Sequence, residues 1–219
     1  MTDGILLIDK PAGMTSFGVV ARIRRVLSEK AGKKVKVGHT GTLDPFATGL
    51  LIIVTGKECK NAEKYSKLDK VYEAEITLGK TSTTGDPEGE ILDISQDEPD
   101  ISKIEKTLVQ FRGEITQKPP IYSAIKIDGE RAYKLARKGK KIDMPERKIN
   151  VYSLEIVKYD YPILNIRTNV SSGTYIRTLA QDIGEALGVG AYCSELRRLS
   201  IDKYSLSEAL KLSNFGIES

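Results

Sequence analysis

The chain has 219 residues, of which 40% are hydrophobic and 29% charged, and its formal net charge is +4. This composition is ordinary for a soluble globular protein, and no apolar run reaches the length of a membrane span. The two cysteines, Cys59 and Cys193, lie far apart, and the sequence has one histidine. That pattern argues against a disulfide framework, a zinc site and a secreted location. We therefore expect a cytoplasmic protein that binds no metal.

The charges are unevenly distributed along the chain. Residues 22–38 contain seven basic side chains and one acidic one, and residues 126–148 contain nine basic and four acidic ones. Residues 84–105 show the reverse, with eight acidic side chains and one lysine. Two basic segments suit a polyanionic partner such as nucleic acid. Each segment alone is equally typical of a solvated helix or loop face.

The first part of the chain predicts a buried strand at residues 4–10 and a helix that ends at Gly32. Thr15 or Ser16 is expected to cap this helix, because apolar residues follow at three-to-four spacing. A second, more polar helix is predicted at residues 57–68. Residues 71–78 alternate between apolar and polar types, which predicts a strand.

The middle of the chain is less regular. Residues 80–99 read as a long loop with a short strand at 90–94, and an amphipathic helix is predicted at 101–111. A strand is predicted at 121–127, followed by a turn at Asp128-Gly129 and a short basic helix at 130–138. Residues 123–148 are interpreted as an excursion from the sheet.

The last part predicts paired strands at 151–158 and 163–171, a clear helix at 174–187 and a short final helix at 205–212. Strands dominate, and they do not alternate regularly with helices. The fold class is therefore predicted to be α+β, with a mixed, mainly antiparallel central sheet flanked by helices.

One short motif suggests a nucleotide site. Gly79-Lys80-Thr81 resembles the end of a phosphate-binding loop, but that motif needs a glycine five residues before Gly79. Position 74 is Ala, and residues 57–78 contain no glycine. We therefore predict no nucleotide cofactor.

The most informative stretch is Gly-His-Thr-Gly-Thr-Leu-Asp-Pro-Phe-Ala-Thr-Gly, at residues 38–49. It contains His39, and Asp44 follows five residues later between two apolar segments. A loop held by strands is a common place for binding and catalytic side chains. The simpler interpretation is a glycine-rich connection in which Asp44 makes a local turn bond.

The order of residues in this loop resembles the catalytic motif of the TruB family of tRNA pseudouridine synthases. Other segments match the family in the same order, and the resemblance runs from residue 4 to about 212. The matching segments are Asp9-Lys10-Pro11-Ala12-Gly13-Met14-Thr15-Ser16, Lys70-Val71-Tyr72, Leu78-Gly79, Thr84-Gly85-Asp86, residues 119–126, Ser172-Gly173-Thr174-Tyr175-Ile176-Arg177 and Leu196-Arg197-Arg198-Leu199.

This resemblance implies a pseudouridine synthase fold, with one catalytic domain over residues 1–219 and a thumb-like, RNA-clamping insertion at about 123–148. It implies an enzyme that needs no cofactor and isomerises uridine to pseudouridine in the T loop of tRNA, at position 55. We expect it to act as a monomer on the T arm. Typical members continue into a C-terminal PUA domain, whereas this chain ends at Ser219. We therefore expect a chain that lacks this domain, either as a minimal form or through truncation. Phe46-Ala47-Thr48 after Asp44-Pro45 resemble the stand-alone bacterial type.

The resemblance also assigns the site. Asp44 is the catalytic carboxylate, Arg177 its ion-pair partner, and Tyr72 stacks on the uracil and takes part in proton transfer. For Tyr72 and Tyr175 a plain core role stays open, and for Leu196 that role is the stronger interpretation on physical grounds. Tyr175 and Leu196 would line the pocket. His39 would occupy the space left by the displaced base or stack against displaced bases, and Lys10 would contact RNA or pack against the active-site strand.

The expected phosphate contacts come from the two basic segments, and they are Arg22, Arg25, Lys126, Arg131 and Lys134. Two alternatives to a stand-alone enzyme remain: an RNA-binding or tRNA-folding protein of the same fold, and a subunit that depends on a guide RNA. The resemblance leaves open whether Asp44 forms an adduct or abstracts a proton to give a glycal.

Overall fold

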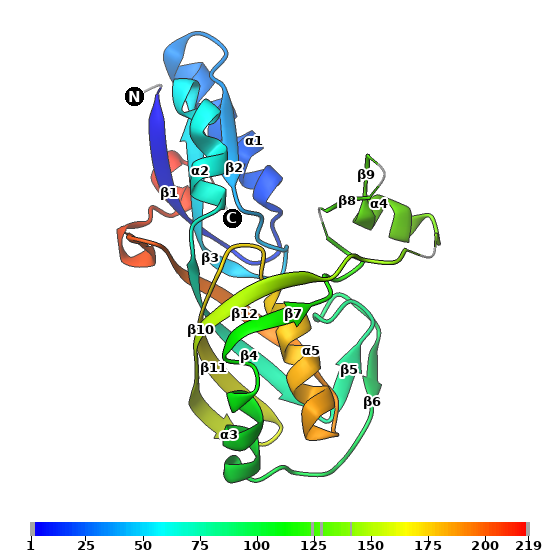
Figure 1. The fold of residues 1–219 in the computed structure, drawn as a ribbon. Helices are drawn as coiled ribbons and strands as arrows, with labels where there is room; N and C mark the ends of the chain where they lie inside the picture. The colour runs from blue at the N-terminus through cyan, green and yellow to red at the C-terminus, as the bar shows by residue number, and fades with distance from the viewer. Residues whose placement is uncertain (1–2, 124, 128, 141, 218–219) are drawn as a thin grey trace. The chain divides into compact units, whose positions relative to one another are not determined.

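A computed structural model describes residues 3–123, 125–127, 129–140 and 142–217, with the backbone alone at positions 133 and 137. The chain divides into two compact units. The first comprises Met1–Glu73 and Leu196–Ser219, and the second comprises Ala74–Glu195. Figure 1 shows helices beside a mixed, mostly antiparallel sheet, which confirms the predicted α+β class.

The first unit is built around strand β3 (Thr48–Thr55). Strand β1 (Gly4–Lys10) pairs with it antiparallel over its full length. Strand β2 (Val37–Thr40) also pairs with it antiparallel. The end of β12 (Ala191–Ile201) pairs with it in parallel, through Arg197 and Arg198, and β13 (Tyr204–Ser205) returns along β12.

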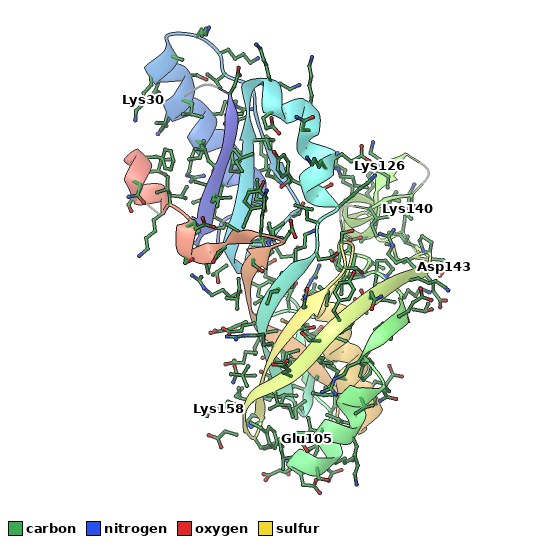
Figure 2. The ribbon with its side chains drawn as sticks, turned by 60° about the vertical axis from the view of Figure 1, so that its left-hand side comes forward. Lys30, Glu105, Lys126, Lys140, Asp143 and Lys158 are labelled. Atoms are coloured by element: carbon green, nitrogen blue, oxygen red, sulfur yellow. The ribbon has the colours of Figure 1, made fainter. Side chains whose placement is uncertain are left out.

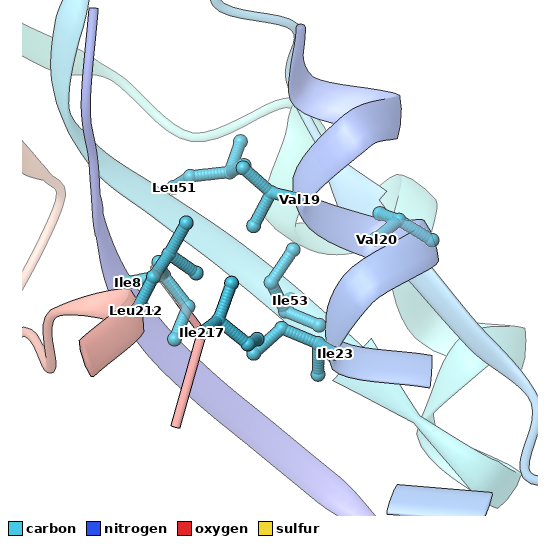
Figure 3. Packing of buried hydrophobic residues seen from close by; sticks show 8 residues of the cluster. All are labelled: Ile8, Val19, Val20, Ile23, Leu51, Ile53, Leu212 and Ile217. Atoms are coloured by element: carbon cyan, nitrogen blue, oxygen red, sulfur yellow. The ribbon is translucent and has the colours of Figure 1, made fainter. Parts of the chain in front are cut away.

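The middle of strand β3, residues 50–54, is continuously apolar, and both of its faces are covered. Leu51 and Ile53 face helix α1 (Ser16–Ala31), where they join a fully buried cluster that Figure 3 shows. Leu50, Ile52 and Val54 face the other way, toward α2 (Ala62–Ser66) and Ile201. Each such side chain contributes roughly 1.5–3 kcal/mol when fully buried. The buried strand thus gives a rigid support to the loop that precedes it.

Helix α1 begins and ends as its sequence predicts. The Thr15 hydroxyl accepts a hydrogen bond from the Gly18 N–H at 2.9 Å, and Gly32 closes the helix with φ of 63°. Val19, Val20 and Ile23 are buried on one face. The helix is therefore anchored against β1 and β3, and its N-terminus is fixed.

The second unit contains the strand order β4-β11-β10-β7. The strands are β4 (Lys70–Leu78, which starts in the first unit), β11 (Ile163–Val170), β10 (Arg147–Asp160) and β7 (Gly113–Gln117). The predicted pair at 151–158 and 163–171 is confirmed, since β10 and β11 are antiparallel. Helices α3 (Ile101–Val109) and α5 (Ile176–Leu187) lie together, and β5 (Lys80–Ser82) forms a hairpin with β6 (Ile91–Asp93).

The proposed thumb contains its own small elements. Strands β8 (Lys126–Ile127) and β9 (Glu130–Arg131) form a separate two-stranded sheet, followed by α4 (Ala132–Arg137). The predicted strand at 121–127 is wrong, because residues 121–123 are bends and, of the described residues in this range, only 126 and 127 lie in a strand. Ala124, Asp128 and Lys141 lie outside the described residues. The turn predicted at Asp128-Gly129 therefore falls partly outside them.

Two predicted helices differ from the structure. Residues 57–68 begin as a 3₁₀ helix, η1 (Gly56–Asn61), before α2. The final helix predicted at 205–212 is wrong, because this stretch forms the 3₁₀ turns η2 (Leu206–Glu208) and η3 (Leu212–Phe215). Between them Leu210 hydrogen-bonds to β1 through both its N–H and its carbonyl, which holds the backbone extended.

Asp182 on α5 provides a pH-dependent test of the fold. Burial, and next the neighbouring Glu185 carboxylate, raise the pKa of Asp182 to about 6 from its usual 3.8. The folded state therefore keeps a proton that the unfolded state has lost, so stability falls as pH rises from about 4 to 6. We expect Asp182→Asn to stabilise the protein at pH 7.5 by about 1 kcal/mol, after allowance for partial solvent exposure. Thermal unfolding at pH 7.5 and pH 4 checks this, and an equal gain at both pH values contradicts it.

Candidate active site

The loop that carries Asp44 is attached at both ends. It leaves β2 through Gly41, whose φ of 85° suits glycine, and re-enters β3 at Thr48. Leu43 is buried, and its N–H and carbonyl both bond the Ser16 hydroxyl, at 2.8 and 2.9 Å. The half-buried Asp44 follows directly, and its carbonyl accepts from the Ala47 N–H at 3.2 Å. The backbone beside the carboxylate is therefore rigidly held.

Lys10 holds the other side of this loop. Its side chain is fully buried, and Nζ donates to the carbonyls of Pro11, Met14 and Pro45 at 2.8, 2.7 and 3.2 Å. The Gly13 N–H also donates to the Pro45 carbonyl at 2.8 Å. These bonds fasten the residue after Asp44 to the segment after β1. Of the two roles expected for Lys10, this geometry supports packing inside the protein over contact with RNA.

Tyr72 and Leu196 lie in the same unit as Asp44, and both are buried, with 7% and 8% of their surface exposed. Tyr72 and Ala74 lie two residues apart on the same, buried face of β4. The Arg198 guanidinium lies 6.0 Å from the centre of its ring. His39 is half-buried on β2, opposite Ile53. The first unit therefore holds four of the predicted site residues together with Lys10.

Arg177 and Tyr175 belong to the second unit. Arg177 is 3% exposed, and its Nη1 donates to the Thr84 carbonyl and to Oδ2 of Asp86, both at 2.8 Å. Its Nη2 donates to the Tyr122 carbonyl at 2.9 Å. The buried Asp86 is thus an ion-pair partner of Arg177. The pairing of Arg177 with Asp44, which lies in the other unit, stays a prediction.

The start of α5 fixes the direction of Arg177. Tyr175 precedes the helix, and the Gln117 side chain bonds its backbone twice, accepting from its N–H at 2.8 Å and donating to its carbonyl at 3.0 Å. Arg177 is the second residue of the helix. The side chain therefore projects from a firmly attached first turn, and not from a solvent-facing one.

Comparison with known proteins identifies the class. A model of the N-terminal domain of TruB family pseudouridylate synthases matches residues 24–176. A model of the tRNA pseudouridylate synthase B C-terminal domain matches residues 177–216. The chain belongs to the TruB family of pseudouridylate synthases. It is therefore an enzyme, a pseudouridine synthase.

Relatives and solved structures agree with this assignment. Proteins named tRNA pseudouridine synthase B are 45% identical in Aquifex aeolicus and 43% identical in Endomicrobium trichonymphae. Each match covers 97% of this chain, and 73% and 90% of the two relatives. A chain of a Cbf5–Nop10–Gar1 crystal structure superposes with a TM-score of 0.75 at 30% identity, over 99% of this chain and 57% of that one.

A second similar structure is an H/ACA RNP bound to a substrate RNA containing 2′-deoxyuridine. It has a TM-score of 0.71 at 28% identity, and the match covers all of this chain and 57% of that chain. The relatives named tRNA pseudouridine synthase B are thus closer in sequence than the matching chains of these two structures.

The five predicted phosphate contacts are all exposed side chains. Arg22 donates to the Gly18 carbonyl at 3.3 Å, and Arg25 lies 3.9 Å from Glu29 on the same helix. Lys126, Arg131 and Lys134 belong to the thumb, where Figure 2 marks Lys126 and Lys140. Their exposure is compatible with RNA contact, and that contact stays a prediction.

Sequence reasoning for a TruB family site missed three buried charges. Lys70 is 6% exposed, Asp86 is 3% exposed, and Arg198 is 1% exposed. All three were part of matching motifs, but a charged residue in a loop or strand is ordinarily interpreted as solvated. For Arg198 the available signal was its spacing from Leu196, since residues two apart on a strand share a face.

Other kinds of site lack support within the described ranges. No three His, Cys, Asp or Glu side chains gather there as metal ligands would. None of the helices described is both long and apolar enough to cross a membrane.

Proposed function

We propose that this enzyme isomerises uridine to pseudouridine in the T loop of tRNA, at position 55, with Asp44 as the catalytic carboxylate. The observation that carries the proposal is the firmly held Asp44 loop in a chain of this family. The relatives' name, tRNA pseudouridine synthase B, supports tRNA as the substrate.

The reaction breaks the C1′–N1 bond of uridine and forms a C1′–C5 bond. The uracil leaves through N1, turns within the pocket, and loses the proton from C5 while N1 gains one. A half-buried carboxylate on a rigid loop suits this chemistry, because it can act on the sugar or base without reorganising. Asp44 would serve in either route, adduct or glycal.

The other site residues have supporting roles in the proposal. Tyr72 stacks on the uracil, and its hydroxyl takes part in proton transfer at C5. Arg177 pairs with Asp44, since a guanidinium carries five donors and can hold Asp86 and a second carboxylate. Tyr175 and Leu196 line the pocket. The pocket must exclude water so that the detached base reacts with the same sugar.

The target uridine lies in a folded RNA loop, so it must be turned out of the loop before reaction. His39 is an aromatic side chain near the start of the catalytic loop, on β2. It is proposed to stack on the bases that the flipped uridine leaves behind. The cost of unstacking would be met by phosphate contacts from the two basic segments.

These phosphate contacts predict a strong salt dependence of binding. Substituting Lys126, Arg131 and Lys134 together by alanine should weaken tRNA binding and lower the slope of log K against log salt by about one for each phosphate that is no longer neutralised. Filter binding at several salt concentrations measures the slope. The control replaces Lys158, a lysine of β10 outside the thumb. An unchanged slope in the triple variant would exclude the thumb as a phosphate-binding segment.

The proposed substrate position is tested by mapping pseudouridine in a tRNA transcript incubated with the purified chain alone. The proposal expects modification at position 55, and none in a transcript with cytidine there. Binding without any pseudouridine would favour the RNA-folding alternative. Activity that appears only after a guide RNA is added would favour the guide-dependent alternative, which the 43–45% identical relatives argue against.

The state of the enzyme in the cell follows from the same proposal. All residues assigned to the reaction come from one chain, so we propose that it acts as a monomer. Cys59 and Cys193 are both free cysteines. Thiols fit a reducing compartment, and we propose the cytoplasm.

A further inference from the structure

Arg198 is a large charged side chain that is almost fully buried, at 1% exposure. It lies on β12, and it contacts three separate segments of the first unit. Nε donates to the Leu50 carbonyl at 2.7 Å, Nη2 to the Gly41 carbonyl at 3.1 Å, and Nη1 lies 3.5 Å from the Tyr72 hydroxyl.

A buried cation is costly unless its surroundings compensate for lost water. The partners of Arg198 within the described part of the chain are carbonyl and hydroxyl oxygens, and none is a carboxylate. A second buried cation, Lys70, lies nearby, and a Cβ at Gly41 would lie 3.8 Å from the side chains of both. Desolvation, and next the charge of Arg198, lower the pKa of Lys70 to about 8. Packing alone would favour an apolar side chain at position 198.

The two carbonyls that Arg198 holds stand on either side of Asp44. Gly41 precedes the carboxylate by three residues, and Leu50 follows it by six. The backbones of β3 and β12 approach closely at this point, since a Cβ at Gly49 would lie 2.3 Å from the Arg198 carbonyl. Gly49 also has φ of 102°, which glycine tolerates. A planar guanidinium spans both ends of the loop, and a lysine could not.

The contact with Arg198 also orients the Tyr72 hydroxyl. Arg198 has only donors, so the Tyr72 oxygen can only accept from it. The hydroxyl hydrogen must then point away from Arg198. The guanidinium also lies 6.0 Å from the ring centre. That distance is within the range of a cation–π contact. Arg198 thus restrains the ring and the hydroxyl of the residue assigned to stacking and proton transfer.

We propose that Arg198 is a positioning residue for the isomerisation, which holds the Asp44 loop by both ends and orients the Tyr72 hydroxyl. This inference rests on the proposed function of the site. Arg198 acts through Asp44 and Tyr72, so its replacement should lower the rate of the chemical step more than the affinity for RNA.

The test compares Arg198→Lys with Arg197→Lys under single-turnover conditions, with excess enzyme over tRNA. Arg197 is the neighbouring arginine on β12, its side chain is 42% exposed, and it pairs with Asp9 at 2.9 Å. We expect Arg198→Lys to lower the rate by about 10²-fold with little change in Kd. Arg197→Lys should stay within about twofold of wild type. Arg198→Gln, which buries no charge, repeats the test if the lysine variant does not fold.

A second arm separates positioning from packing. In a Tyr72→Phe background the fall in rate caused by Arg198→Lys should be clearly smaller than in wild type, because the hydroxyl it orients is gone. An equal fall in both backgrounds overturns the role at Tyr72. A folded Arg198→Lys enzyme with the wild-type rate, or one changed only in Kd, overturns the proposal entirely. If wild-type protein itself makes no pseudouridine, the proposed function fails instead.

Discussion

Replacing Asp44 by asparagine should abolish pseudouridine formation while the protein still folds and binds tRNA. The substitution removes the negative charge and keeps the size of the side chain. It also leaves the loop anchors intact, because these are made by Lys10, Ser16 and Leu43. We expect the single-turnover rate to fall at least about 10³-fold, since no other group is assigned the same role. The measurement is the yield of pseudouridine from excess enzyme over hours.

The matched control for this variant is Asp9→Asn. Asp9 is also a carboxylate of the first unit, paired with Arg197 at 2.9 Å, but it has no assigned role in the reaction. The Asp9→Asn substitution should lower the stability of the protein and leave the single-turnover rate near that of wild type. If Asp44→Asn retains activity comparable to the Asp9 variant, another residue carries the chemistry.

The second large effect is expected at Arg177. Its guanidinium bridges the carbonyls of Thr84 and Tyr122 and the buried Asp86 carboxylate. Lysine keeps the charge but has no planar fork, so Arg177→Lys cannot restore all three hydrogen bonds. We expect turnover to fall about 10²-fold or more, and stability to fall by about 1–3 kcal/mol. Steady-state kinetics well below the melting temperature separate the two effects.

Asp86→Asn is the control for a purely structural arginine. It breaks the buried ion pair, which should cost about 3–5 kcal/mol, but leaves the guanidinium bound to both carbonyls. Its folded fraction should therefore turn over faster than Arg177→Lys. If the two variants lose rate in proportion to their loss of stability, Arg177 only supports the fold. A wild-type rate in Arg177→Lys would remove the argument for an ion pair with Asp44.

Elements set by local rules were predictable from the sequence. Thr15 caps α1 and Gly32 ends it, because both rely on side-chain or backbone chemistry within one turn. Helix α5 was predicted two residues too long at its start, since the Gln117 side chain holds the Tyr175 backbone outside the helix. Such boundaries depend on a distant partner, which periodicity cannot reveal.

The failures have the same origin. The apolar stretch around Leu210 has helical spacing, but hydrogen bonds to Leu7 and Asp9 draw it alongside β1. Near Ile121 the residues alternate as in a strand, yet they form bends. In each case a tertiary contact or local chain reversal overrides intrinsic preference.

The site shows a similar division. Asp44 and Tyr72 could be named from a motif, because the motif preserves their order along the chain. The structural partners of that motif could not be named so easily. Lys10 binds three carbonyls, and Arg198 binds two, and neither arrangement leaves a charge pattern in the sequence. Buried cations satisfied by backbone carbonyls become visible only once the strands are paired.

The most direct test of the account measures tritium release from tRNA transcribed with [5-³H]uridine, using purified protein without guide RNA or cofactor. Isomerisation replaces the C5–H bond with a C5–C1′ bond, so each event releases one tritium to water. Wild-type enzyme should release close to one equivalent per tRNA, and Asp44→Asn should release none. No release by folded wild-type protein that binds the tRNA, or equal release by both proteins, would contradict the assignment of Asp44 to this reaction.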